Sequence, residues 1–284
     1  MKQLIVSADD FGLTKSMSEG AVKAYRDGIV TSLNLLPAGS AFEESLYLLK
    51  DIKLNEIGAH LSLTETSPVT DPARITSLVT KEGNFHANYP PFFINLFTGK
   101  IKTDDIYLEL RSQLDRLKRT NLPIVSLNSH EHIHMMPFLL KIFIELAGEY
   151  NIPFIRYPHG DRLVSPFSLK KLFKAIVLSY FGKRIEGMVR ESGIYAADNF
   201  LGHLDSGNLN EGVLIRLLDN LREGTTELVC HPGFLSPQIL DRYTFHLDCE
   251  SELSALTSRR VKRVIEDRGI RLVTYGEILS ERKR

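Results

Sequence analysis

The sequence is poor in cysteine: Cys230 and Cys249 are the only two among 284 residues. Two thiols cannot build a disulfide framework or a zinc site made of cysteines alone, so folds that depend on either are excluded. A surplus of one charge is missing too, because 35 Lys and Arg residues balance 35 Asp and Glu residues. This balance argues against a nucleic-acid-binding protein that works through a general positive field.

Long apolar runs are also absent from the sequence. The first residues, "MKQLIVSADD", contain an apolar run too short for a signal peptide, and no stretch approaches the ~18 apolar residues of a membrane span. No internal repeat, low-complexity tract or linker divides the chain. With 43% hydrophobic residues, the chain can still bury a large core. The sequence therefore predicts one domain over residues 1–284 and a cytoplasmic location.

Short apolar runs instead alternate with amphipathic stretches. The runs that predict strands lie at 3–9, 29–36, 57–63, 123–130, 153–158, 226–233 and 270–275. The stretches that predict helices lie at 17–28, 41–51, 104–119, 138–150, 210–223 and 251–268. This alternation predicts parallel strands with right-handed crossovers, and about seven such units fit a distorted (β/α) barrel better than an open sheet. We interpret the long stretches at about 64–103 and 158–207 as loop insertions that carry function.

Ionisable side chains lie at the carboxyl ends of five predicted strands. These residues are Asp9 and Asp10, His60, His130, Arg156 and His231. Taken singly, each has a simpler explanation, such as a helix cap, a turn residue or a buried core histidine. Five strand ends together are harder to explain that way, because in a barrel of parallel strands these ends form the active-site face. The sequence therefore predicts one site drawn from several strands.

The run "SLNSHEHIHMMP" (126–137) places His130, His132 and His134 at every second position. If the run were fully extended, His130 and His134 would lie ~13 Å apart, at ~3.3 Å per residue. Bonds from a metal ion to nitrogen are only ~2 Å long, so one ion could not bind both ends of an extended run. The remaining ligands of any metal site must come from elsewhere in the chain.

The strand-end residues contain the parts of a metal-dependent hydrolase. Asp10, His60 and His130 form a set of two histidines and one carboxylate that suits a single divalent ion, which would activate water and polarise a carbonyl group. Asp9 is a candidate general base, and His231 a candidate proton donor to the leaving group. The alternatives are a non-haem iron oxygenase, which uses the same ligand types, a non-catalytic sugar-binding protein with a relic metal site, and a phosphoesterase.

The chain resembles the YdjC-type carbohydrate deacetylases in four motifs, which occur in matching order over most of its length. These motifs are "ADDFG", "GAHLSL", "NSHEHIH" followed by "MMP", and "CHPG". That family is related to the polysaccharide deacetylases and has a (β/α) barrel. The resemblance implies that Asp10, His60 and His130 bind the metal, Asp9 is the base and His231 the acid. It also implies removal of an acetyl group from an N-acetylated sugar with Mg²⁺ or a similar divalent ion, although imidazole ligands would equally suit Zn²⁺.

The remaining expectations concern the substrate. The resemblance places His132, His134 and Arg156 where they line or orient the site. The stretch "DNFLGHLDSGNL" (198–209) resembles the branch of the family associated with hopanoid biosynthesis. Residues 168–190 predict a helix with one apolar face and lysines away from it, which packs on its own domain, on a second subunit of a homo-oligomer, or on a membrane surface. A membrane contact would suit a glycolipid substrate.

Overall fold

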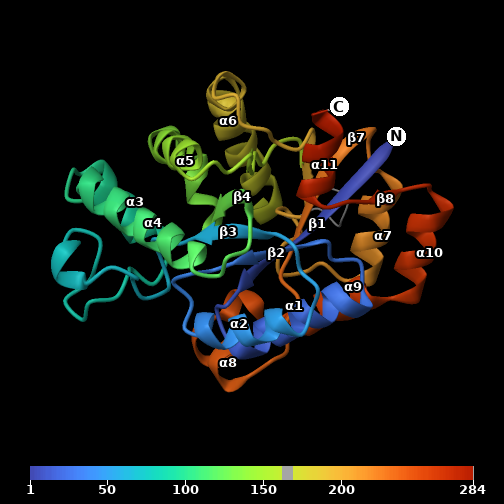
Figure 1. Cartoon of the computed structure of the whole chain (residues 1–284), viewed down its shortest axis with the longest axis horizontal. Coiled ribbons are helices and arrows are strands. Elements are labelled where there is room, and N and C mark those ends of the chain that lie inside the picture. Colours follow the sequence, from blue (N-terminus) through green and yellow to red (C-terminus); the bar gives the residue numbers. More distant parts are fainter. Residues whose placement is uncertain (162–168, 284) are drawn as a thin grey trace.

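One curled sheet of parallel strands lies at the centre of the computed structural model, which describes residues 1–161 and 169–283 (Figure 1). Its strands, all parallel to their neighbours, are β1 (Lys2–Phe11), β2 (Ser32–Leu35), β3 (Ile57–Leu61), β4 (Ile124–Ser129), β5 (Phe154–Ile155), β6 (Asn199–Leu201), β7 (Gly224–Cys230) and β8 (Arg271–Leu272). The order is β5-β4-β3-β2-β1-β7-β6, and β8 pairs with the first residues of β1. Seven strands thus form a half-barrel that ends at β5 and β6, which confirms the predicted distorted (β/α) barrel.

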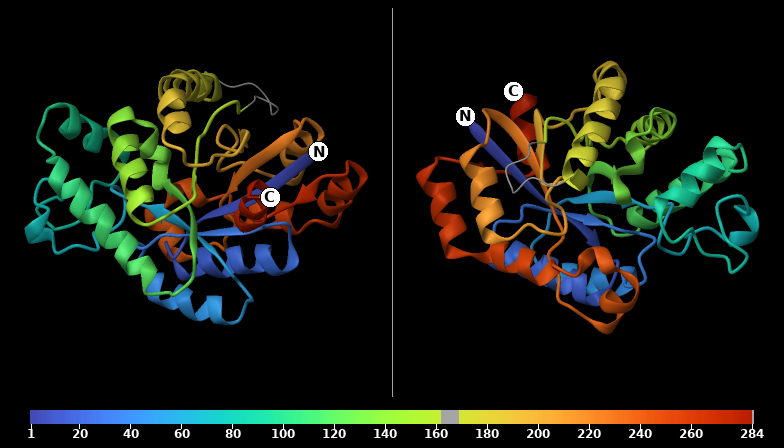
Figure 2. Two further views of the ribbon diagram at one scale, coloured as in Figure 1. Left: turned by 45° about the horizontal axis from the view of Figure 1, so that its top comes forward. Right: turned by 180° about the vertical axis from the view of Figure 1, so that it is seen from behind.

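Helices surround this half-barrel (Figure 2). They are α1 (Lys15–Asp27), α2 (Phe42–Lys50), α3 (Tyr89–Phe97), α4 (Thr103–Lys118), α5 (Pro137–Glu149), α6 (Leu169–Glu191), α7 (Glu211–Asp219), α8 (Pro237–Arg242), α9 (Cys249–Thr257), α10 (Arg259–Asp267) and α11 (Tyr275–Arg282), with 3₁₀ turns η1 (Pro72–Arg74), η2 (His130–Met135) and η3 (Thr244–His246). No helix within residues 1–161 and 169–283 combines the length and apolar character needed to span a bilayer.

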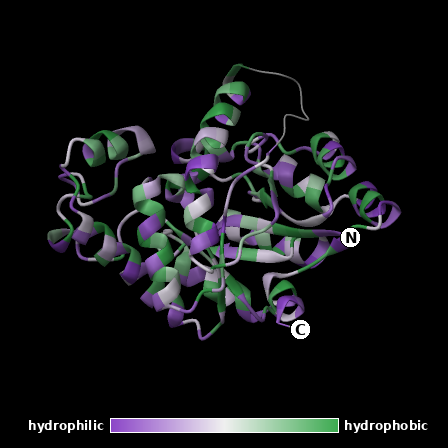
Figure 3. Cartoon of the chain, turned by 90° about the horizontal axis from the view of Figure 1, so that it is seen from above, coloured by the Kyte–Doolittle hydropathy of each residue, from purple (hydrophilic) through white to green (hydrophobic). Residues whose placement is uncertain are grey.

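The two faces of the sheet differ in chemistry because successive residues of a strand point to opposite sides. In β1, Leu4 and Val6 are fully buried in the main core, which also contains side chains of the surrounding helices, while Ser7 and Asp9 alternate with them and point inward. Figure 3 shows much apolar colouring in the central strands and a mixture of apolar and hydrophilic colouring on the outer helices. A small apolar cluster that includes Ile5 and residues of α11 fills the inner face away from the polar residues. The half-barrel therefore has a polar interior at one end only.

Three features of the chain differ from the sequence prediction. The predicted helix at 251–268 is wrong as a single helix: it breaks at Ser258, whose extended backbone ends α9 and whose side chain caps α10 by accepting from the backbone N–H of Val261. The stretch 64–103 is not irregular throughout, because it contains η1 and α3, and α3 begins with prolines that a first helical turn tolerates. The insertion at 158–207 contains β6, which was not predicted, and α6, which agrees with the helix predicted at 168–190; residues 162–168 lie outside the described part of the chain.

Candidate active site

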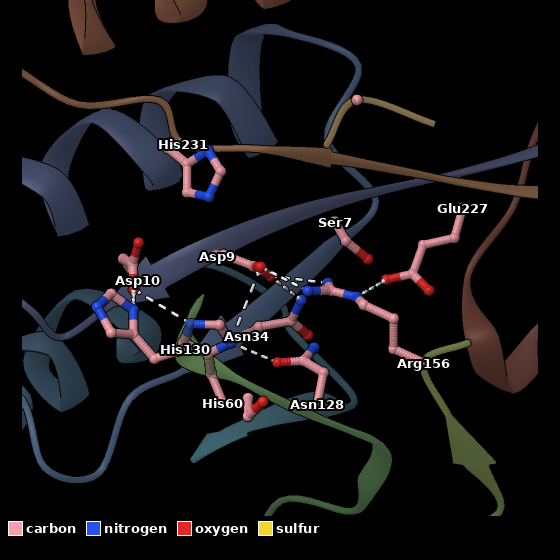
Figure 4. Close-up of polar contacts among 12 residues, drawn as sticks. Ser7, Asp9, Asp10, Asn34, His60, Asn128, His130, Arg156, Glu227 and His231 are labelled. Carbon is pink, nitrogen blue, oxygen red and sulfur yellow. Dashed lines mark hydrogen bonds and ion pairs between the residues drawn. The ribbon is translucent and has the colours of Figure 1, made fainter. Parts of the chain in front are cut away.

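The end of β1 is irregular, and this irregularity brings two neighbouring carboxylates to the site. In a regular strand, Asp9 and Asp10 would point to opposite faces. Asp10 instead has a φ of +60°, and the pairing with β2 shifts register between Ala8 and Phe11. A left-handed conformation is costly for a residue with a Cβ atom, and it is often found at functional sites. Both carboxylates consequently reach the polar end of the half-barrel (Figure 4).

Asp10, His60 and His130 form a compact buried cluster. One oxygen of Asp10, Oδ1, lies 2.8 Å from Nδ1 of His130 and 3.2 Å from Nε2 of His60. Two ligand atoms bound at about 2.1 Å and at right angles on one ion lie about 3 Å apart, so these separations fit a shared metal ion. Nε2 of His60 is also buried without a hydrogen-bond partner, which is unfavourable unless something binds there. The three residues therefore fit a divalent metal ion.

The ring of His60 is held by a neighbour on β4. Its Nδ1–H donates to the side-chain oxygen of Asn128, which leaves the lone pair of Nε2 directed toward Asp10. Hydrogen bonds of this kind fix the tautomer and the orientation of metal-binding histidines. Asn128 was not predicted as part of the site, although it is a polar residue inside the apolar strand predicted at 123–130.

Two carboxylates lie at opposite ends of the His130 ring. Nδ1 faces Asp10, and Nε2 lies 2.9 Å from Oε2 of Glu65 in the loop after β3. Burial by itself lowers the pKa of His130, but the charges of Asp10 and Glu65 outweigh it and raise the pKa well above its ordinary value. Glu65 was missed because it lies in a loop, where no periodic pattern marks an inward-pointing side chain.

Asp9 takes part in a buried ion cluster next to the histidines. Its two oxygens accept hydrogen bonds from Nη1 and Nη2 of Arg156, at 2.6 and 2.9 Å, and Oδ1 accepts a further one from Asn34. Burial is the largest single influence and raises the pKa of Asp9, but the charges of Arg156 and His60 and the hydrogen bonds from Arg156 together outweigh it and lower the pKa to about 2. Nε of Arg156 donates to Glu227 at 2.7 Å. The structure thus places Arg156, which was expected to line or orient the site, between two buried carboxylates.

His231 follows β7 and, in Figure 4, lies across from Asp9 and Asp10. Its backbone N–H donates to Oε2 of Glu252 at 2.6 Å, and its Nδ1 lies 3.9 Å from the same oxygen. A further buried histidine, His246, has Nε2 at 3.3 Å from the second oxygen of Asp10, and burial lowers the pKa of His246 to about 3. Glu252 and His246 lie on α9 and η3, outside any strand end, and the sequence analysis did not find them.

The histidine run after β4 is not extended. Glu131 and His132 have φ values of +54° and +52°, which turn the chain sharply within η2 and direct the three histidines differently. Nε2–H of His134 donates to the backbone carbonyl of Arg156 at 3.1 Å, and its Nδ1 accepts from the Ser129 hydroxyl at 2.5 Å. Both nitrogens of His134 are therefore engaged with the chain, and this ring holds the turn against the residue that follows β5.

His132 lies on the side of η2 that faces the second insertion. Its ring contacts the rings of His203 and Phe200, with centroid distances of 4.8 and 5.8 Å. Burial, followed by the nearby His203, lowers the pKa of His132 well below its ordinary value, so its ring is neutral. His203 was another residue that the strand-end pattern could not reveal.

Comparison with known proteins agrees over the whole chain. The sequence profile of the family described as YdjC-like protein matches residues 3–267. A carbohydrate deacetylase of Brevibacillus brevis is 30% identical over 277 residues, which cover 97% of this chain and 99% of that protein. A carbohydrate deacetylase of Thermoanaerobacter pseudethanolicus is 28% identical over 276 residues, with the same shares covered.

A solved structure shows the same fold. The crystal structure of an Enterococcus faecalis protein, provisionally described as a cellobiose-phosphate cleavage protein, superimposes with a TM-score of 0.79 and 26% sequence identity. The superposition covers 98% of each chain, so the half-barrel and both insertions have counterparts of similar length in that protein.

Proposed function

The chain belongs to the YdjC-like protein family, and from this premise we propose that it is a metal-dependent carbohydrate deacetylase. The names of its relatives support an enzyme that acts on acetylated sugars. One observation carries the metal-dependent part of the proposal: the buried cluster of Asp10, His60 and His130 lies directly beside the ion pair of Asp9 with Arg156. The reaction we propose is hydrolysis of the acetamido group of an N-acetylated sugar.

The proposed roles follow from the position and charge of each side chain. A divalent ion bound by Asp10, His60 and His130 would lower the pKa of water and polarise the acetyl carbonyl. Asp9 is ionised at neutral pH because of Arg156, so it is in the correct form to accept a proton from the attacking water. His231, on the opposite side, donates a proton to the departing amine, and Glu252 holds the backbone N–H of His231 with its carboxylate 3.9 Å from Nδ1 of the ring. His132 and His134 orient the wall of the site.

The ligand set does not by itself decide between metals. Two imidazoles and one carboxylate suit Zn²⁺ as well as Mg²⁺, and they also suit the ferrous ion of oxygenases. We propose Mg²⁺ on the basis of the family resemblance. The second candidate function, a non-haem iron oxygenase, explains neither the Asp9–Arg156 pair nor His231, and it would require O₂ for turnover.

The proposed function predicts metal-dependent release of acetate. Protein stripped with a chelator should release none from N-acetylglucosamine oligomers, their 6-phosphates or a lipid-linked N-acetylated sugar, and Mg²⁺ or Zn²⁺ should restore release from at least one of them. Acetate measured under nitrogen and under air separates a hydrolase from an oxygenase. Release that survives complete metal removal would contradict the metal site, and a bound metal without any release would leave only a binding role.

A lipid-linked substrate is the finer part of the proposal, and α6 supplies its structural basis. Four large apolar side chains on one face of α6 are exposed: Leu169 at 77%, Phe173 at 68%, and Ile176 and Tyr180 at 58% each. The opposite face packs inward through Leu178, Ile185 and Val189. One turn further along the same face of the helix, the exposed residues at 183 and 184 are a lysine and an arginine. An apolar stripe followed by cations fits the surface of an anionic bilayer.

The double change of Phe173 and Ile176 to Ser tests this contact. We expect the unchanged protein to co-sediment with vesicles that contain anionic lipid but not with neutral vesicles, and the double variant to bind several-fold less. The matched control is Tyr47→Ser on α2, which removes an equally exposed aromatic ring from the far side of the molecule. A protein that stays in solution, but dimerises through this face, would show that α6 binds a second copy.

We further propose the substrate branch, the location and the domain organisation of the protein. The hopanoid-related substrate is tested by the lipid-linked member of the acetate assay. We also propose that the protein is cytoplasmic. We propose one barrel domain over residues 1–284, with residues 64–103 and 158–207 as insertions.

A further inference from the structure

The two histidines of the candidate metal site face Asp10 with different ring nitrogens. His60 uses Nε2 and His130 uses Nδ1. The nitrogen that points away from Asp10 has a partner in each case, but the partners differ in charge: a neutral amide, Asn128, for His60 and a carboxylate, Glu65, for His130. This asymmetry is a property of the described side chains and needs no assumption about which ion is bound.

The position of Glu65 is fixed by its backbone. Its N–H donates to the carbonyl of His86 at 2.8 Å, and its carbonyl accepts from Nη2 of Arg242, also at 2.8 Å. Its φ of +61° lies in the left-handed region, where residues with a Cβ atom are uncommon. Contacts from the first insertion and from α8 thus hold a strained residue in place, and such strain is frequent at functional positions.

Glu65 lies on the side of the His130 ring that faces away from Asp10, so it is not itself a metal ligand. The two nitrogens of an imidazole point away from each other, and Oε2 of Glu65 is 2.9 Å from the nitrogen that does not face Asp10. The carboxylate can therefore act on a metal only through His130. A carboxylate that accepts from the distal N–H of a metal-binding histidine fixes its tautomer and makes its other nitrogen a stronger donor.

We propose that Glu65 is a positioning residue that commits His130 to metal binding through Nδ1, whereas Asn128 commits His60 to binding through Nε2. This inference rests on the metal site of the proposed function and adds to it a residue outside the ligand set. A carboxylate accepts a stronger hydrogen bond from the distal N–H than an amide does. His130 is therefore the stronger of the two histidines as an electron-pair donor to the metal.

Calorimetric titration of the chelator-treated protein with Mg²⁺ and with Zn²⁺ tests the proposal. Glu65→Gly should weaken binding about 10- to 100-fold, the usual effect of losing such a partner. Glu65→Gln should weaken it less, because its amide oxygen can still accept from Nε2–H. Glycine suits the observed φ, so the metal-free melting temperature should not fall in that variant. The matched control, Glu82→Gln, alters an exposed carboxylate of the same insertion and should change nothing.

Nitrogen NMR of ¹⁵N-histidine-labelled protein loaded with Zn²⁺ gives a second readout, one that a merely structural role would not produce. His130 should show a protonated Nε2 and a metal-bound Nδ1, and His60 the reverse. Binding through the same nitrogen in both rings, or unaltered affinity in the Glu65 variants, would overturn the inference alone. Failure of the unchanged protein to bind either ion would overturn the proposed metal site, and the inference with it.

Discussion

Replacement of Asp9 by Asn is expected to lower kcat about 10²- to 10⁴-fold, the usual contribution of a general base. The change keeps the shape of the side chain and removes only its charge and its ability to accept a proton. Metal affinity should stay within a few-fold, because Asp9 is not among the clustered ligands and comes no closer than 3.8 Å to Nδ1 of His60. Initial rates of acetate release, measured beside a metal titration, check both parts.

Two further variants separate the base from its surroundings. Asp10→Asn should show the opposite pattern, with weakened metal binding as the cause of lost activity. Glu227→Gln removes the other carboxylate that Arg156 contacts, yet should leave most of the turnover. Near-normal kcat in Asp9→Asn would show that Asp9 is not the base. Equal loss of turnover in Asp9→Asn and Glu227→Gln would show that the ion cluster as a whole matters instead.

Replacement of Arg156 by Met should cause the largest loss of stability. The guanidinium is almost fully buried between Asp9 and Glu227, and its removal leaves two buried carboxylates without their shared cation. Loss of one partner from such a cluster costs about 3–5 kcal/mol, which corresponds to a fall of roughly 5–8 °C in Tm for a chain of this length. The matched control is Arg111→Met, because Arg111 pairs with Glu149 on the surface and should contribute about 1 kcal/mol or less.

The pH dependence of the difference in Tm between the unchanged protein and Arg156→Met identifies the cause of that difference. The pKa of Asp9 is about 2 in the folded protein, below the ordinary value of ~3.9 in an unfolded chain. The ion pair therefore stabilises the fold fully above pH ~4, and this contribution is lost as the pH falls toward 2. The gap in Tm between the unchanged protein and Arg156→Met should be widest at pH 7 and should narrow toward pH 3. A gap that is constant with pH would mean that lost packing, rather than lost charge, destabilises the variant.

The fold could be predicted because parallel strands buried on one face against helices produce short apolar runs at regular intervals. Strand positions were found for all but β6, whose three residues lie within an insertion and carry no alternation. Helix boundaries were less certain: nothing in the sequence around Ser258 distinguishes a helical serine from one that caps a new helix. Local conformation there depends on how α9 and α10 pack on their neighbours.

The candidate site was predictable where it depends on strand ends. Asp10, His60 and His130 lie on three different strands or just beyond them, and parallel pairing brings these ends together without further information. Two partners in the ion cluster, Asn34 and Glu227, are polar residues within apolar strands, one or more residues before the strand ends. Asn34 donates to Asp9, and Glu227 accepts from Arg156. A polar residue inside an apolar strand is therefore a second sign of the site in the sequence.

Other parts of the site could not be predicted. Glu65, His246 and Glu252 come from a loop, a 3₁₀ turn and a helix, and their side chains reach the site only through the path that the chain takes around the barrel. Left-handed residues such as Asp10 and Glu65 depend on tertiary contacts that offset a local cost, and no propensity scale anticipates them.

The central place of β1 in the sheet also determines when the site can form. This strand is made first, but Lys2 pairs with Gly224 of β7, and Gln3 pairs with Arg271 of β8. Contacts between such distant segments slow folding, because a long loop must close before they can form. During synthesis on the ribosome, β1 can pair with β2 early, but its other edge must wait for β7, and His231 meets the carboxylates of β1 only then. A nascent chain released before β7 is complete would lack both the finished sheet and a working catalytic centre.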